Sequence, residues 1–181
     1  MQIAKQVDLI AREFEEETDL FVAVSQIQRR LFSYEDSLNA YALDIASVML
    51  KRADQADYDT WLRVGEGITR ATRKRLRSPA IANEYQRMQA EQVDLIKTIP
   101  HEAAMKVHEW VRSGLANGQR FPEIAARIKN ELGASTEARA ICIARTETAR
   151  ARSNFTQARA KAVGSTGYIW RTVGDGAVLD R

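Results

Sequence analysis

The sequence predicts a mainly α-helical protein, in which an elongated helical N-terminal part is followed by a compact helical unit ending in a short β-hairpin. Only three prolines and nine glycines occur among 181 residues, so long uninterrupted helices are expected. Apolar residues recur at intervals of three and four along most of the chain, which is the period of an amphipathic helix. Near residue 168 the period changes to two, which indicates strand.

The N-terminal part covers residues 1–77, and no function can be assigned to it from its sequence. Apolar spacing predicts helix over residues 3–31. The acidic run at 13–19 is a candidate break within that stretch. We therefore expect either one long helix or two shorter ones at the start of the chain.

Two further helices are expected before residue 78. Ser33 and Asp36 resemble a capping arrangement, which predicts the start of a helix there. The apolar face of this helix is expected to consist of Leu38, Tyr41, Ile45, Val48 and Met49. Residues 54–59 are predicted to form a polar connection, and another helix is predicted over 60–76.

The second part of the chain, residues 78–181, begins with a clear helix start. Ser78 is a suitable N-cap, and Pro79 suits the first helical position because that position needs no N–H donor. Pro100 is expected to end or kink this helix. The next helix is predicted over 101–115.

Glycines and prolines delimit the remaining helices. The sequence Asn117–Gly118 predicts a helix end, and Pro122 predicts the start of a short helix that Gly133 terminates. Ser135 is expected to cap a last helix that runs to about Val163. One face of this helix is expected to carry mainly small residues, which would let another helix approach closely: Ile141, Ala144, Thr148, Ala151, Phe155, Ala158 and Ala162.

Composition excludes several classes of protein. Hydrophobic content of 45% and charged content of 28% are typical of a soluble globular chain. No apolar run approaches the length that spans a bilayer, and no signal peptide is recognised, so synthesis in the cytoplasm is expected. Cys142 is the only cysteine and is expected to be buried and inert. His101 and His108 are expected to be surface residues, so neither a metal site nor a cofactor is predicted.

Charge is distributed unevenly along the chain. Residues 1–60 hold six basic and twelve acidic side chains, whereas residues 61–181 hold twenty-one basic and twelve acidic ones. Five of the eight residues at 70–77 are cationic, namely Arg70, Arg73, Lys74, Arg75 and Arg77. These residues are candidates for contact with nucleic-acid phosphates. Arginines placed at a helix C-terminus, or a solvated face, would give the same pattern.

A polar heptapeptide, residues 144–150, lies within the last predicted helix. Arg145, Thr146, Glu147 and Arg150 are close enough on a helix to interact, and they could belong to a catalytic cluster. The alternative is a structural network that fixes this helix against the hairpin and against the helices at 101–132. We favour the structural network, because a buried arginine needs an acceptor in a defined position.

Residues 91–181 resemble the phage head morphogenesis family, the minor head proteins typified by the F protein of phage Mu. Asp175 falls where the family has an aspartate in its hairpin turn. The other matching stretches are Val93–Pro100, Gly114–Gly118, Ile124–Ala125, Ile143–Arg150 and Gly167–Thr172, which includes Trp170. The family pattern continues beyond the position of Arg181, so the domain over 78–181 is expected to be incomplete at its C-terminus.

The resemblance implies a structural, non-enzymatic virion protein made in the bacterial cytoplasm. Such proteins lie inside the head near the portal vertex and act in capsid assembly, DNA packaging or DNA delivery. The expected partners are the portal protein, the major capsid protein, or both, with packaged DNA as a further candidate. Two alternatives remain open: an enzymatic or toxin-associated module with a site around Arg145–Glu147, and a helix-turn-helix DNA-binding protein.

Overall fold

A computed structural model of the chain describes residues 2–14, 19–65 and 68–167. These residues are mainly helical, as predicted, and contain no strand. The hairpin expected after residue 167, with Trp170, lies outside the described residues.

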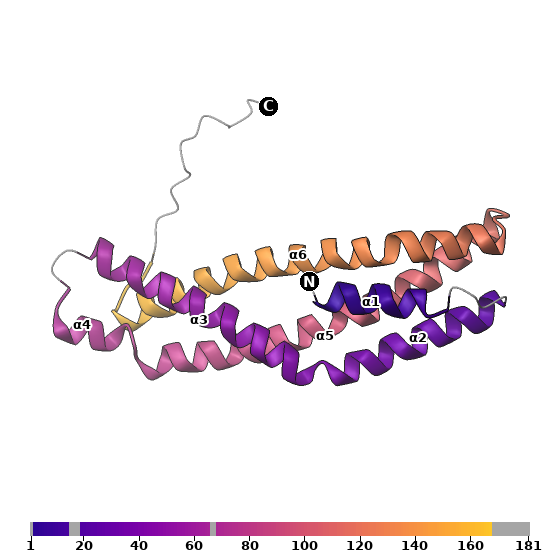
Figure 1. Cartoon of the computed structure of the whole chain (residues 1–181). Helices are drawn as coiled ribbons and strands as arrows, with labels where there is room; N and C mark the ends of the chain where they lie inside the picture. The colour runs from indigo at the N-terminus through magenta and orange to yellow at the C-terminus, as the bar shows by residue number, and fades with distance from the viewer. Residues whose placement is uncertain (1, 15–18, 66–67, 168–181) are drawn as a thin grey trace, which may run out of the picture.

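The helices form one elongated bundle (Figure 1). Its two longest members, α5 and α6, pack against each other, and α3 packs against both. α1 lies against α6, and α2 lies against α5. The helices are α1 (Gln2–Arg12), α2 (Leu20–Ser37), α3 (Asn39–Val64), α4 (Arg70–Arg75), α5 (Pro79–Ala116) and α6 (Phe121–Ala162). At 1.5 Å per residue, α6 alone is roughly 60 Å long.

The apolar core is divided unequally along this bundle. The larger cluster lies where α1 and α2 pack on α5 and α6, and it includes Val7, Leu31, Val107 and Leu132. The end of the bundle near α4 has a much smaller cluster, made of Leu50, Ala53, Ile81, Met88, Ala151 and Phe155. Less apolar burial is therefore available to hold α3, α5 and α6 together at that end.

The stretch at 3–31 forms two helices, which is one of the two expected outcomes, and Asp19 caps α2 by accepting hydrogen bonds from the N–H groups of Phe21 and Val22. Two other predicted helix boundaries in the N-terminal part are wrong. Ser33 lies inside α2 and does not start a helix. Residues 54–59 lie inside α3 and do not form a connection, because two of their carboxylates pair with an arginine of α6.

The predicted apolar face around α3 is correct only in part: Leu38 is buried, and Tyr41 and Met49 pack against the core. Ile45 and Val48 are exposed, whereas the buried face is built mainly from alanines and Leu50. Small residues allow α3 to lie close to both α5 and α6, so the larger β-branched residues face outward.

In residues 78–181 the first helix begins where it was predicted to begin, but the helices do not end at Pro100 or at Gly133. Pro79 begins α5 and Asn117 ends it, with Gly118 at a φ of 70°. Pro100 does not end α5, which continues to Ala116. Gly133 lies within α6, because it serves close packing: a Cβ there would lie 2.9 Å from the Oδ1 atom of Asp8 on α1.

Candidate functional site

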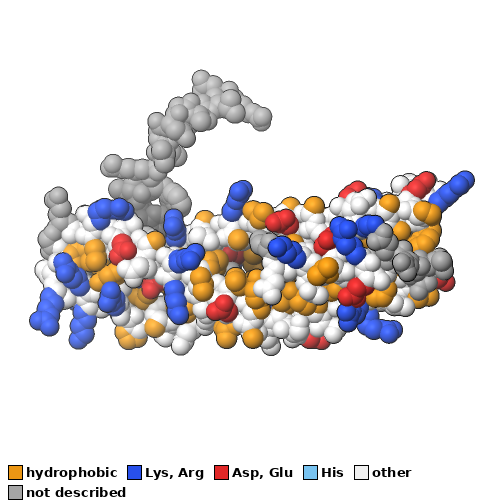
Figure 2. Space-filling view, viewed as in Figure 1, with side chains coloured by type: hydrophobic (Ala, Val, Ile, Leu, Met, Phe, Trp, Pro, Cys, Tyr) orange, Lys and Arg blue, Asp and Glu red, His pale blue; other side chains and the backbone are white. Residues whose placement is uncertain are grey.

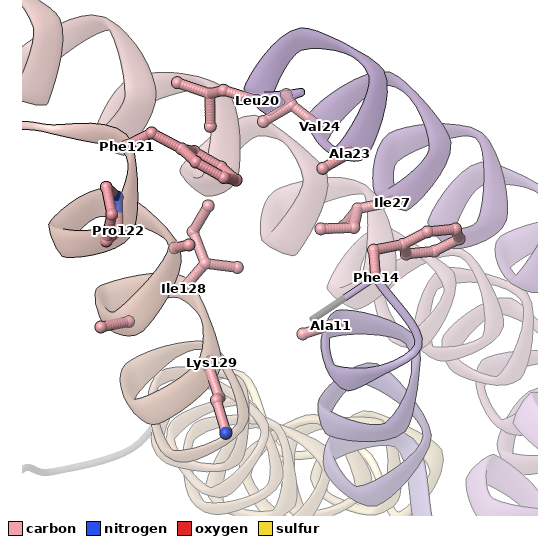
Figure 3. Close-up of a pocket in the computed structure, with 12 residues that line it drawn as sticks. Ala11, Phe14, Leu20, Ala23, Val24, Ile27, Phe121, Pro122, Ile128 and Lys129 are labelled. Atoms are coloured by element: carbon pink, nitrogen blue, oxygen red, sulfur yellow. The ribbon is translucent and has the colours of Figure 1, made fainter. Parts of the chain in front are cut away.

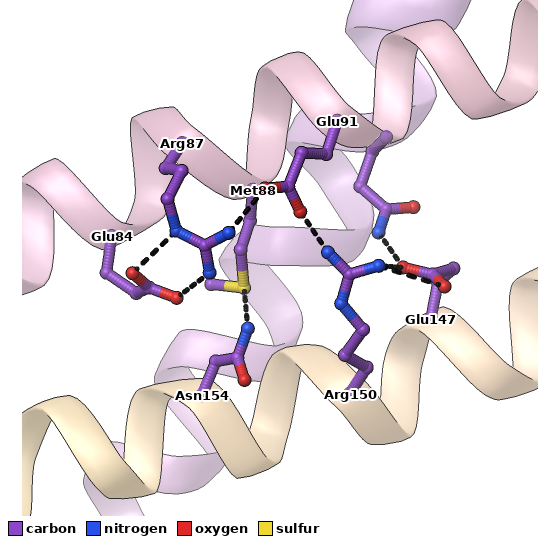
Figure 4. Close-up of polar contacts among 8 residues, drawn as sticks. Glu84, Arg87, Met88, Glu91, Glu147, Arg150 and Asn154 are labelled. Atoms are coloured by element: carbon purple, nitrogen blue, oxygen red, sulfur yellow. Dashed lines mark hydrogen bonds and ion pairs between the residues drawn. The ribbon is translucent and has the colours of Figure 1, made fainter.

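The polar heptapeptide contributes to a set of hydrogen bonds between α5 and α6. Glu147 is buried on α6, and its carboxylate accepts a hydrogen bond from the side-chain amide of Gln92 on α5. The guanidinium of Arg150 lies 3.1 Å from the same carboxylate and also pairs with Glu91 (Figure 4). One turn of α6 is thereby fixed to one turn of α5.

The network continues along α5 toward the α4 end. Glu91 also pairs with Arg87, which donates in turn to Glu84. Arg87 lowers the pKa of the Glu84 carboxyl through this hydrogen bond, and Glu84 raises the pKa of Arg87. We call these six residues the interhelix ladder: Glu84, Arg87, Glu91, Gln92, Glu147 and Arg150.

The residues of the heptapeptide do not all belong to the ladder. Arg145 and Thr146 are exposed on the outer side of α6, away from Glu147. The ladder joins α6 to residues 84–92, and not to the 101–132 region that the sequence suggested. The expected contact with Trp170 falls outside the described residues.

The buried face of α6 includes Ala151 and Phe155, as predicted, but otherwise differs from the predicted small-residue face. Ile141 and Ala144 are exposed, whereas Ile143, Glu147 and Arg159 are buried. Hydrophobic periodicity places the face incorrectly because two of its members are charged.

A second polar site, near the α4 end, was not predicted from the sequence. The Arg159 side chain is only 2% exposed, and its Nη1 atom lies 2.5 Å from a carboxylate oxygen of buried Asp57. Its Nη2 atom pairs with Asp54, and its Nε atom donates to the backbone carbonyl of Leu76 at 3.2 Å. Thr156 donates a further hydrogen bond to Asp57. We call this group the Arg159 cluster.

The sequence contains a partial signal for the Arg159 cluster. Arg145, Arg152 and Arg159 recur at steps of seven, but only Arg159 is buried. Asp54 and Asp57 lie three residues apart, so they share one face of a helix once α3 is known to be continuous. Because residues 54–59 were predicted to form a connection, the shared helix face of these two aspartates was not recognised.

The five cations of residues 70–77 are all exposed, and four of them lie on α4. The guanidinium of Arg77 lies 4.3 Å from the ring centroid of Tyr58 on α3. Leu76, directly after α4, is fully buried and holds the helix against the bundle.

An apolar pocket of about 310 Å³ lies between α1, α2 and the start of α6 (Figure 3). Its walls include Phe14, Leu20, Ile27 and Phe121, and Lys129 is the only charged residue among the described residues of the lining. Among the described residues that line it, none has a carboxylate, histidine, cysteine or hydroxyl side chain.

The structure also places the other residues considered as sites. Cys142 is exposed, so the expectation of a buried thiol was wrong. His101 and His108 lie on the surface of α5, and His101 Nδ1 is 3.5 Å from a carboxylate oxygen of Glu35. Within the described ranges, no three histidine, cysteine or acidic side chains are grouped so that they could hold a metal ion. No helix in the same ranges is long and apolar enough to cross a bilayer.

Comparison with known proteins finds a relative in Haemophilus influenzae. This uncharacterized protein is 32% identical over 153 residues, which are 82% of this chain and 34% of that protein. The chain therefore spans about a third of the length of this relative. No protein-family model matches the chain. No solved structure matches it either.

Proposed function

We propose that this chain is a non-enzymatic minor head protein of a bacteriophage, acting in head assembly or DNA delivery by binding the portal or major capsid protein. It would lie inside the head near the portal vertex. The proposal starts from the sequence resemblance over residues 91–181. The observation that favours a structural role is the use of Glu147 in the interhelix ladder.

A catalytic carboxylate must reach its substrate and must be free to exchange a proton. Glu147 is only 6% exposed, and its carboxylate is engaged by Gln92 and Arg150. Arg145, the other charged residue of the enzymatic alternative, is exposed on the outer side of the same helix. The two side chains therefore do not converge on a common pocket, which supports a structural role.

Two finer expectations belong to the same proposal. The β-hairpin after residue 167 would belong to the domain over 78–181, which is expected to be incomplete at its C-terminus. The helices of 1–77 would form a distinct region, although α1 and α3 pack directly on α6.

Co-purification tests the proposed partner. The protein, expressed from its full reading frame together with the portal protein of the same phage, should be retained on an affinity column that holds tagged portal protein. Absence of retention at low salt, for both portal and major capsid protein, would contradict the proposal.

Replacement of Glu147 by glutamine separates the structural role from the enzymatic alternative. Glu147→Gln places an amide opposite the Gln92 amide and removes one of the two carboxylates with which Arg150 pairs. We expect a loss of about 1–3 kcal/mol in the free energy of unfolding, measured by chemical denaturation. Glu109→Gln, at an exposed position on α5, is the control and should change little. Unchanged stability in Glu147→Gln would refute the structural role.

A further inference from the structure

We propose that the α4 end of the bundle is a docking surface for the sugar-phosphate backbone of double-stranded DNA. The biological setting of this inference rests on the proposed function, but its chemistry rests on the side chains of one surface. We call this surface the basic end, and it comprises Arg63, Arg70, Arg73, Lys74, Arg75 and Arg77. Figure 2 shows lysines and arginines gathered at the end of the bundle that carries α4.

The charges of the basic end are not neutralised within the described part of the chain. Some arginines elsewhere on the bundle surface have carboxylate partners, as Arg87 has in Glu84 and Arg139 has in Glu102, whereas others are isolated cations among the described residues. None of the six cations of the basic end forms such an ion pair with a described residue. The nearby carboxylates of Asp54 and Asp57 are already bound by Arg159. The local field therefore favours an anionic partner.

The basic end is held in a fixed position. Thr69 caps α4 by accepting a hydrogen bond from the N–H of Thr72, and the other end of the helix is anchored by buried Leu76. Arg159 donates to the Leu76 carbonyl, and Arg77 lies over the ring of Tyr58. A surface held in this way loses little conformational entropy when a partner binds.

The residues between the cations indicate the class of partner. From Thr69 to Ser78 the only large apolar side chain is Leu76, which is buried, and Thr69 and Thr72 add hydroxyl groups. Protein interfaces have an apolar or aromatic centre, and membrane-binding helices have an apolar face. Arginine, lysine and threonine are the side chains that contact nucleic-acid phosphates.

The same residues favour duplex over single-stranded nucleic acid. Single-strand binding uses exposed aromatic rings on which bases stack. Residues 69–78 contain no aromatic side chain, Tyr58 beside them is buried and covered by Arg77, and Trp61, two residues before Arg63, is partly buried. The expected binding is therefore independent of base sequence and strongly dependent on salt.

The test measures the affinity of the purified protein for a labelled DNA duplex by fluorescence anisotropy across a series of salt concentrations. The basic-end variant replaces Arg73, Lys74 and Arg75 by alanine. The control variant replaces three exposed cations elsewhere, Lys5, Arg29 and Arg112, by alanine and so loses the same charge. Circular dichroism checks that both variants keep their helices.

We expect the basic-end variant to bind at least about tenfold more weakly, with the salt slope reduced by about one for each phosphate that the variant no longer neutralises. The control should stay within about threefold of the unmodified protein. Equal losses in the two variants, or no binding to duplex, would overturn the inference. A preference for single-stranded DNA, duplex RNA or vesicles of anionic lipid would also overturn it; exposed Val64 beside the basic end makes the vesicle comparison necessary. Portal protein is absent from this assay, so portal binding and DNA binding can fail separately.

Discussion

Removing the arginine of the Arg159 cluster should destabilise the bundle more than any other single change of charge in the described residues. In Arg159→Met the Asp57 carboxylate, on a residue only 7% exposed, keeps its charge and loses its cation. The backbone carbonyl of Leu76 also loses a donor. Asp54 is less affected, because its side chain is 36% exposed and can be solvated.

The expected magnitude follows from these contacts. Removing one partner of a buried ion pair costs about 3–5 kcal/mol, because the remaining charge stays buried without compensation. Methionine fills part of the volume left by the arginine stem, so a large cavity term is not added. We therefore expect a loss of about 3–5 kcal/mol in the free energy of unfolding.

Urea denaturation followed by circular dichroism measures this loss. Arg152→Met, at an exposed position on the same helix, is the control and should change stability by less than about 0.5 kcal/mol. The double variant with Asp57→Asn should recover part of the loss, because the uncompensated charge is gone. A loss below about 1 kcal/mol in Arg159→Met, or strict additivity in the double variant, would refute the reasoning.

Two further changes test the packing of α5 on α6. Glu102 accepts hydrogen bonds from Arg139 at 2.6 and 2.8 Å, which lowers its pKa below the usual 4.5. The pair contributes to the free energy of unfolding above about pH 4.5, and this contribution is lost as the pH falls through the lowered pKa. Glu102→Gln should therefore reduce the free energy of unfolding at pH 7 by less than about 1 kcal/mol. Melting curves of the variant should also show a weaker loss of stability at acid pH. In Gly114→Ala the new methyl would lie 2.7 Å from Ile124, and overpacking of about 1–3 kcal/mol should exceed the helix-propensity gain of about 1 kcal/mol. Gly118→Ala meets no neighbour and should lose about 1–2 kcal/mol through its positive φ alone; a rise in melting temperature for either glycine variant would contradict this account.

The helical class of this protein could be predicted from composition and periodicity, because those properties reflect which residues can be buried in a helix. The position of Pro79 and the end of α5 near Gly118 followed from local backbone constraints. Such constraints act within a few residues and are independent of the rest of the fold.

The incorrect boundaries have a common physical cause. Gly133 and residues 54–59 look like interruptions when only local propensity is considered. In the fold Gly133 allows α1 to approach α6, and Asp57 is neutralised from 102 residues away by Arg159. Long-range pairing outweighs a local propensity cost of about 1 kcal/mol, and one sequence alone does not show which residues will pair.

The same difference between local and long-range signals applies to the candidate sites. The basic run at 70–77 could be found from the sequence because its charge density is local. The α5 partners of Glu147 and Arg150 could not be found, since Gln92 and Glu91 lie more than fifty residues away and carry no distinguishing pattern. Arg159 was missed because a hydrophobic pattern treats any arginine as an exposed residue.

The buried charges of Glu147 and Arg159 restrict how α6 can be aligned along its neighbouring helices. Helices with many small residues on the contact face can pack in several alignments, each shifted by one turn of roughly 5.4 Å. Glu147 meets α5 and Arg159 meets α3 at points twelve residues apart, which is roughly 18 Å along α6. A shift by one turn would separate Glu147 from Gln92 and leave Arg159 buried without its carboxylates, so only one alignment satisfies both side chains. The axial position of α6 relative to α5 and α3 is thereby fixed by polar contacts at two points.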